Sequence, residues 1–348
     1  MTDVQWETLS NQAVAAAGVV YFLALLSYLV EWTALRKLPA YENPTTGRTA
    51  MFGRLGLLLT VIGTAVHFVA LLGRGMAADP NRVPWGNMYE FTVSGSFFVS
   101  LLFLVLLRRF SLDWMGPLVV GFVLSVLMAA VVWLHAPVAP LTEALYSPWL
   151  VIHVVSAVIA TAAFTLGGIT SLLFLLKSRS ERRATSDRAP AAAGAESSGG
   201  GVGVAYADDA PGEAATTGYL ARIPDSTTLD RLSYRMHAFA FPVWTFAVLI
   251  TGPIWAHEAW SSYWSWDPKE VWAFITWVVY AAYLHARTTA GWKGRNAAIL
   301  ALVGLATLWF NFIGINFFST TSQHSYAEGA PAVVQPWEAP AQAGHTPV

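Results

Sequence analysis

A segment between residues 255 and 270 concentrates the side chains that could hold a flat aromatic ligand. It contains Trp255 and then the run Trp260-Ser-Ser-Tyr-Trp264-Ser-Trp266-Asp267-Pro268-Lys269-Glu270. Tryptophan offers a broad apolar face and one N–H donor, and the run ends in two carboxylates and a lysine. These residue types suit an apolar, planar ligand with a charged edge, such as haem with its propionates. The same density of tryptophan is also typical of the aromatic belt at a membrane surface.

Histidine side chains could bind the iron of a haem held there. Two of the eight histidines lie near the ends of apolar runs, His153 and His324. His285 lies 18 residues after Asp267, which is about 27 Å if the segment is helical. One haem cannot rest on the tryptophan segment and also bind His285, so His285 is either structural or marks a second haem position. His67, His135 and His257 are further candidate ligands, and His237 could partner His285 on a second haem. Each of these four histidines could equally have a purely structural role.

The composition is that of an integral membrane protein. Of the 348 residues, 55% are hydrophobic and 12% are charged, whereas soluble domains carry about 25% charged residues. An apolar run of about 17–25 residues can cross a bilayer as a helix. Eight such runs predict an all-α, polytopic membrane protein, with helices at roughly 13–35, 53–73, 91–107, 117–134, 149–176, 238–256, 271–287 and 296–317.

Lysine and arginine predict how these helices are oriented. All but three of the 20 such residues lie beside alternate helix ends, and the exceptions are Arg74, Arg82 and Lys269. Because cytoplasmic loops are the positive ones, both termini are predicted outside, in a protein of the cytoplasmic (plasma) membrane. The tryptophan segment, His153 and His324 then share the outer face. The net charge of −1, with no separate basic patch, excludes nucleic acid as a partner.

Two membrane halves are predicted, residues 1–177 with five helices and residues 231–325 with three. Between them, residues 178–230 begin with charges and become rich in Ala, Gly and Ser, which predicts a disordered cytoplasmic linker. Residues 326–348, with repeated Ala-Pro, predict a disordered outer tail. The chain has no cysteine, so thiol chemistry at the outer face would use the sulfur of another molecule.

Asp267 and Pro268 predict the start of a helix. Asp is a good N-cap, Pro suits the first turn, and Glu270 stands where a capping box needs it. Such a start would hold Trp264 and Trp266 in fixed positions, and Lys269 could meet a propionate. In a second polar and aromatic segment, before the third helix, Glu90 either caps that helix or shapes the outer site. That segment is Pro84-Trp-Gly-Asn-Met-Tyr-Glu90-Phe91.

These segments closely resemble the CcsA/ResC family of cytochrome c biogenesis proteins, sometimes labelled CcsB, among the haem-handling membrane proteins with a tryptophan-rich WWD signature. The signature corresponds to residues 260–270, continued by Trp272-Ala-Phe-Ile-Thr-Trp277 and Tyr283-Leu-His285-Ala-Arg287. Other similar segments are Asn87-Met-Tyr89-Glu90, Pro148-Trp149-Leu-Val-Ile-His153 and Gln323-His324-Ser-Tyr326. One departure is Ser261, where the family usually has glycine.

The resemblance implies specific roles for these residues. It implies that His153 and His324 are the axial ligands of haem b at the WWD site, which is formed by Trp255, Trp260, Trp264, Trp266 and Asp267. It implies that His285 ligates an inner, transmembrane haem. The second histidine of that inner position would come from a membrane partner of the ResB/CcsB type.

From the resemblance we expect the haem-delivering subunit of a holocytochrome c synthase, or haem lyase, of system II. Haem would pass outward from His285 to the tryptophan segment, where thiols of apocytochrome c attack its vinyl groups. Thiolate is the reactive form, and the chain would position and ligate haem rather than transfer protons. Two alternatives stay open: a haem exporter or chaperone without ligase activity, and a non-haem polytopic transporter in the lipid bilayer.

Overall fold

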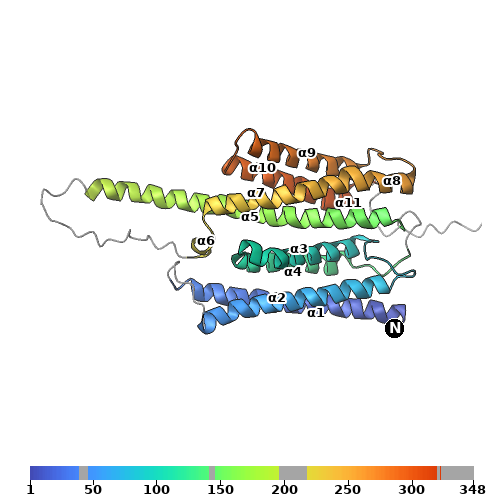
Figure 1. The fold of residues 1–348 in the computed structure, drawn as a ribbon. Helices are drawn as coiled ribbons and strands as arrows, with labels where there is room; N and C mark the ends of the chain where they lie inside the picture. The colour runs from blue at the N-terminus through green and yellow to red at the C-terminus, as the bar shows by residue number, and fades with distance from the viewer. Residues whose placement is uncertain (39–45, 141–145, 196–217, 320–321, 323–348) are drawn as a thin grey trace, which may run out of the picture.

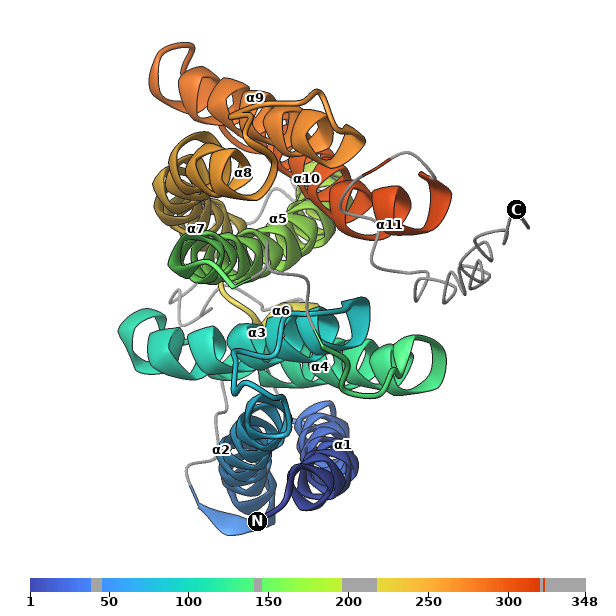
Figure 2. The same cartoon turned by 90° about the vertical axis from the view of Figure 1, so that its right-hand side faces the viewer.

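The protein is a bundle of long helices lying side by side (Figures 1 and 2). The computed structural model describes residues 1–38, 46–140, 146–195, 218–319 and 322. Within these ranges every regular element is helical and no strand occurs, so the predicted all-α fold class is confirmed.

The first half of the bundle follows the predicted runs closely. It contains α1 (Asp3–Leu35), α2 (Gly47–Met76) and α3 (Met88–Phe110). A short 3₁₀ turn, η1 (Asp113–Met115), leads into α4 (Gly116–Ala129), which continues as a π-helical segment, η2 (Ala130–Leu134). The long helix α5 (Pro148–Ala195) follows.

The second half starts with the short helix α6 (Tyr219–Arg222). One continuous rod then comprises α7 (Ser226–Thr245), the π segment η4 (Phe246–Thr251) and α8 (Gly252–Trp260). After the tryptophan loop come α9 (Pro268–Thr288), α10 (Arg295–Trp309), the π segment η5 (Phe310–Gly314) and α11 (Ile315–Phe318).

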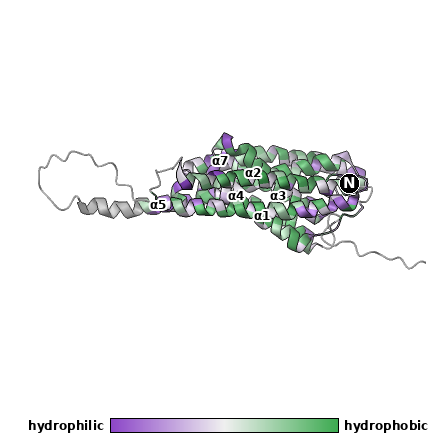
Figure 3. Cartoon of the chain, turned by 90° about the horizontal axis from the view of Figure 1, so that it is seen from below, coloured by the Kyte–Doolittle hydropathy of each residue, from purple (hydrophilic) through white to green (hydrophobic). Residues whose placement is uncertain are grey.

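Seven helices in the described part of the chain are long and apolar enough to cross a membrane, and hydrophobic residues cover their central length (Figure 3). The eighth predicted helix is present as α9. Its 21 residues extend about 31 Å, enough for a hydrocarbon core of about 30 Å. It is less apolar than the other seven because it carries His285 and Arg287 among its tryptophans and tyrosines.

The predicted linker is partly helical. α5 continues to Ala195, and both α6 and the first turn of α7 fall within residues 178–230. The run after Lys177 is rich in Arg and Ala, which are good helix formers, so the helix outlasts the apolar run that predicted its end. Residues 196–217 and the predicted outer tail, residues 326–348, lie outside the described residues.

The helix termini gather at two ends of the bundle. The starts of α1 and α5, the loop between α8 and α9, and α11 lie together at one end, which we call the site end (Figure 1). The extension of α5 and helix α6 lie at the opposite end (Figure 1). This grouping agrees with the alternation that the charges predict, and which end faces outward stays a prediction from those charges.

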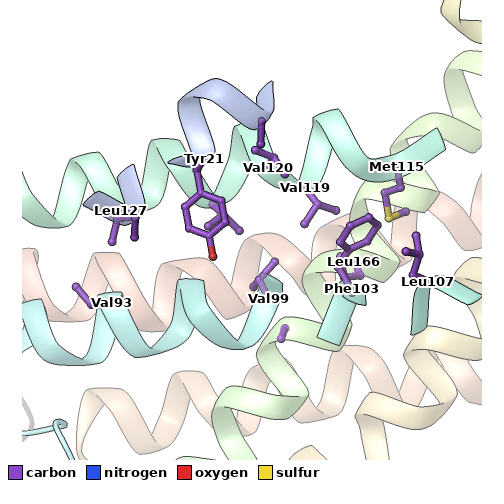
Figure 4. Close-up of a cluster of buried hydrophobic side chains, with 14 of the residues drawn as sticks. Tyr21, Val93, Val99, Phe103, Leu107, Met115, Val119, Val120, Leu127 and Leu166 are labelled. Atoms are coloured by element: carbon purple, nitrogen blue, oxygen red, sulfur yellow. The ribbon is translucent and has the colours of Figure 1, made fainter. Parts of the chain in front are cut away.

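The interior of the first half is built on α1, α3 and α4. Its largest buried side chains include Tyr21, Phe103, Met115 and Leu127, and Leu166 reaches them from α5 (Figure 4). Small residues let the helices approach each other, as is usual in membranes. A Cβ on Gly63 would lie 3.0 Å from the ring of Tyr21.

Hydroxyl groups also join these helices. The Tyr21 hydroxyl lies 3.2 Å from Ser100 Oγ and 3.3 Å from Thr64 Oγ1, and those two oxygens are 2.6 Å apart. The group therefore links α1, α2 and α3 by side-chain hydrogen bonds, which are worth roughly 0.6 kcal/mol each in membrane proteins.

A buried ion cluster fastens α2 and α3 at the site end. The Glu90 carboxylate, with a side chain that is 0% exposed, accepts from Arg74 Nε at 3.0 Å and Arg82 Nη1 at 2.7 Å. It also accepts the Gly86 N–H at 2.7 Å. The N-cap of α3 is Asn87, whose Oδ1 accepts the Glu90 N–H. Glu90 therefore does not cap α3, which was one of its two predicted roles. Its side chain instead holds the loop before α3, which fits the other predicted role of shaping the site.

We expect Glu90→Gln to destabilise the protein strongly. Removing one partner of a buried ion pair costs about 3–5 kcal/mol because the other charge stays buried, and here two guanidinium groups lose the same carboxylate. Thermal unfolding of the detergent-solubilised protein should show a Tm lowered by several degrees. The matched control, Asp3→Asn at an exposed position of the same end, should leave the Tm unchanged, and equal Tm values for both variants would contradict the assignment.

Candidate functional site

A cavity lies between the two halves of the bundle and reaches the site end. Its empty volume is about 1600 Å³ when space open to the surroundings is included. Its wall comes from α3, α4, α5, α8, α9 and η5, with contributions from neighbouring segments. Most lining residues are aliphatic or aromatic, and the polar ones include Asn87, His153, Lys269, Glu270 and Asn311.

His153 lies in this wall, in the second turn of α5. Its Nδ1 is 2.9 Å from the carbonyl oxygen of Ala247. A carbonyl only accepts, so Nδ1 carries the proton and, in the neutral ring, Nε2 carries the lone pair. The ring also stacks on Trp255, with centroids 6.1 Å apart and planes at 14°. This anchored tautomer is the one that metal-ligating histidines commonly adopt.

The carbonyl that anchors His153 comes from the π segment η4. The Ala247 oxygen also accepts the Gly252 N–H and, at 3.1 Å, the Thr251 hydroxyl. Gly252 makes room for the imidazole, because a Cβ there would lie 3.2 Å from His153 Cε1 and Nδ1. Segments of π-helix are frequent at functional sites, and η2 and η5 also lie in the last turns of their helices at this end.

The tryptophans of the signature divide into those that line the cavity and those that support it. Trp255, 3% exposed, and Trp264 both line it. Trp260 packs edge-on against Trp255, with centroids 4.8 Å apart. Trp266 lies outside the lining, is 77% exposed, and packs at 89° against Trp264 with centroids 5.9 Å apart. The predicted platform therefore has an inner layer and an outer layer.

Glu270 fixes the outer layer. Its Oε2 accepts the N–H groups of Ser265 at 2.9 Å and Asp267 at 3.2 Å, the two residues that flank Trp266. Between them, Trp266 has a φ of 59°, a left-handed conformation that is strained for a bulky residue. One carboxylate oxygen thus holds the backbone on both sides of the exposed indole.

Ser261 is the second left-handed residue of the loop. With a φ of 56° it ends α8, and its N–H donates to the His257 carbonyl at 2.9 Å. Glycine reaches this conformation without steric cost, so the glycine that the resemblance leads us to expect would suit this position. The serine adopts the left-handed conformation as well.

The predicted start of α9 is confirmed. Asp267 is the N-cap, and Glu270 completes a capping box. The Asp267 carboxylate, in a residue only 5% exposed, also accepts the Ser322 hydroxyl at 2.9 Å. On the cavity side, Lys269 Nζ donates to Asn316 Oδ1 at 3.2 Å. These bonds tie the end of the described chain to the start of α9, and His324 itself lies outside the described residues.

The other candidate histidines within the described residues do not line this cavity. His285 is exposed, on the same face of α9 as Phe274, Val278 and Ala282. His237 is fully buried and packs against Tyr283, with ring centroids 4.9 Å apart. The alternative in which His237 and His285 share one haem is therefore not supported, because the two rings face the core and the exterior respectively.

Two features of the site were not predicted. Asn311, 7% exposed, lines the cavity from η5. Its sequence signal was available, because an amide within an apolar run is costly in lipid and marks a functional position. The anchoring role of the Ala247 carbonyl and the room that Gly252 gives to the His153 ring could not be predicted from the sequence. Both depend on how α5 packs against the π segment η4.

Comparison with known proteins identifies the family to which this chain belongs. The family model of the cytochrome C assembly protein matches residues 85–322, a range that contains the entire cavity lining. The chain belongs to this family. The resemblance predicted from the signature residues is thereby confirmed, and α1 and α2 precede the matching region.

Named relatives support the same family. Cytochrome c biogenesis protein CcsA of Synechococcus sp. (strain JA-3-3Ab) is 33% identical, over 92% of this chain and 95% of its own length. The protein of the same name from Gloeobacter violaceus is 33% identical, over 91% and 95%. Among solved structures, the cytochrome c haem lyase CcmF has a similar fold, with a TM-score of 0.54 at 16% identity over 90% of this chain. This chain corresponds to 49% of the CcmF chain.

We expect Gly252→Ala to disturb the anchor of His153. The new methyl group would lie 3.1 Å from the Ala247 oxygen and 3.2 Å from the imidazole, and overpacking of this kind costs about 1–3 kcal/mol. Thermal unfolding should give a lower Tm. The control is Gly95→Ala, which lines the same cavity with nothing within 4 Å of the new Cβ; a Tm that falls equally in both would show that the anchor is not the cause.

Proposed function

We propose that this protein binds haem and presents it for attachment to apocytochrome c, as the haem-delivering subunit of a membrane holocytochrome c synthase of system II. The observation that carries the proposal is His153, held by the Ala247 carbonyl in the wall of an aromatic cavity. Family membership supports the pathway, and the chemistry of the cavity supports the ligand.

The residues around the cavity fit haem b as a bound substrate. Apolar and aromatic walls suit the porphyrin faces, and the stacked pair of His153 and Trp255 puts an iron ligand beside an indole plane. The Lys269 ammonium, with three donor protons, suits a propionate. His324, two positions after Ser322, follows a residue that is bonded to Asp267, and we assign it as the second axial ligand at the same site.

Thioether formation between haem and apocytochrome c requires little acid–base catalysis from the residues of this chain. Each thioether forms when the S–H of a substrate cysteine adds across a vinyl group of haem: a C–S bond forms, the proton goes to carbon, and no electron is lost. The chain has no cysteine, so both thiols belong to apocytochrome c. Its own residues ligate the iron, orient the ring and exclude water, which are the contributions of a positioning catalyst.

His285 fits a second haem position shared with another protein. It ends an exposed face of α9 that is otherwise apolar, formed with Phe274, Val278 and Ala282. A haem bound to this outward-facing ring would need its other axial ligand from a neighbour. We therefore assign His285 to an inner haem that a ResB-type membrane partner completes, from which haem moves to the cavity.

Reconstitution tests the function. The purified protein, a ResB-type partner, haem and a reduced apocytochrome with a Cys-x-x-Cys-His segment should give covalently attached haem, measured by mass spectrometry. Haem binding without thioether product would favour the exporter or chaperone alternative. A spectrum with no Soret band after haem addition would leave only the non-haem transporter.

We expect His153→Ala to lose haem from the cavity. Removing an axial ligand should weaken haem affinity by about tenfold or more, and added imidazole should restore part of the Soret band because it can occupy the vacated coordination position. His324→Ala should behave alike. The control is His257→Ala, an exposed histidine of the same end that stacks on Tyr263. Wild-type spectra from both ligand variants would refute the axial assignment.

We expect His285→Ala to act only in the presence of the partner. The variant should lose haem that co-purifies with the complex, yet the isolated chain should bind added haem at the cavity as the wild type does. Haem content of the two preparations, measured as the pyridine haemochrome, separates the sites. An equal loss in the isolated chain would contradict a shared inner position.

A further inference from the structure

Asn311 stands apart among the polar groups of the cavity. It is 7% exposed, it lines the cavity, and its Oδ1 has no hydrogen-bond partner in the described part of the chain. Other polar groups of the wall use their bonds locally: Asn87 caps α3, Thr92 donates to Met88, and Ser96 donates to Val93. Asn311 is thus a buried acceptor that points to a ligand.

The side chains around Asn311 are aromatic, and none in the described chain donates a hydrogen bond to its Oδ1. It belongs to the π segment η5, next to Phe312, which packs against Phe91 with ring centroids 5.0 Å apart. Trp309 packs against Phe122 at 5.7 Å. A buried polar group without a partner destabilises the fold, and native proteins retain few of them without a reason.

We propose that Asn311 binds one carboxyl group of the ligand, a protonated propionic acid side chain of haem. An amide presents an acceptor and a donor side by side, and a carboxylic acid presents the same pair in reverse. The acid O–H would donate to Oδ1 and the Nδ2–H would donate to the acid carbonyl, so two hydrogen bonds form. This proposal rests on the proposed function, and it adds a residue that selects which edge of the haem faces η5.

The chemistry of the pair explains why an amide serves here rather than a second lysine. The aromatic wall around Asn311 penalises a charge, whereas a neutral acid paired with a neutral amide buries no net charge. Lys269, in the first turn of α9, lines the same cavity and donates to Asn316 Oδ1 at 3.2 Å, and its ammonium suits the second, ionised propionate. Two carboxyl groups in different environments are thereby recognised by two different side chains.

Haem dimethyl ester tests the proposal, because its esters keep the ring, the iron and the vinyl groups but cannot donate a proton. Titrations of the detergent-purified full chain should be followed at the Soret band with haem and with the diester. The wild type should prefer haem by about tenfold or more, because the diester loses both the hydrogen bond to Asn311 and the charge that meets Lys269. In Asn311→Leu, haem affinity should fall several-fold toward that of the diester, with the remaining preference due to Lys269, and the affinity for the diester should change little.

A matched variant controls for the loss of a buried amide. Asn11 also has a buried Oδ1 without a partner in the described chain, but it lines a different cavity beside α1; Asn11→Leu should keep the full preference for haem. Asn311→Ala, which adds no bulk, should give the same loss of preference and replaces Asn311→Leu if that variant does not fold. An unchanged preference in both Asn311 variants, or an equal loss for haem and diester, would overturn the proposal. Wild-type protein that binds neither compound would instead refute the proposed function.

Discussion

The site depends on the hydrogen bond between His153 Nδ1 and the carbonyl oxygen of Ala247. Lipid offers no water to backbone groups, so a membrane helix must satisfy them internally. In the π segment η4, this one oxygen accepts from the Gly252 N–H, the Thr251 hydroxyl and His153 Nδ1. The irregular backbone is thus compensated by the same bond that sets the tautomer of the imidazole. Local helix geometry and ligand chemistry are therefore one feature of the structure.

Much of the fold was predictable from the sequence because hydropathy alone specifies which segments can cross a bilayer. The eight apolar runs all became helices, and Asp267, Pro268 and Glu270 correctly marked the start of α9. The errors lie where hydropathy stops being informative. α5 runs past its apolar part to Ala195 because the following charged residues still favour helix, and the three π segments depend on tertiary packing rather than on composition.

The site was predictable in its residue types more than in its geometry. His153, Trp255 and Trp264 meet at one cavity, as their predicted position at the same ends of their helices required. The sequence could not separate Trp264 from Trp266, which are two residues apart and equally aromatic. Their difference arises from the left-handed backbone at residue 266, held by Glu270 through Ser265 and Asp267. Such a contact is visible only once the loop is folded.

The hairpin of α1 and α2 lies outside the family region, yet it acts on the cavity. Arg74 of α2 and Arg82 both hold the Glu90 carboxylate, and that carboxylate in turn accepts the Gly86 N–H. The residues on either side of Gly86, Trp85 and Asn87, line the cavity. The hairpin therefore contacts this part of the cavity wall through Arg74, which also pairs with Glu7 of α1 at 3.4 Å, although the described residues of α1 and α2 do not line the cavity. A change at Arg74 can thus reach the wall through the Glu90 carboxylate.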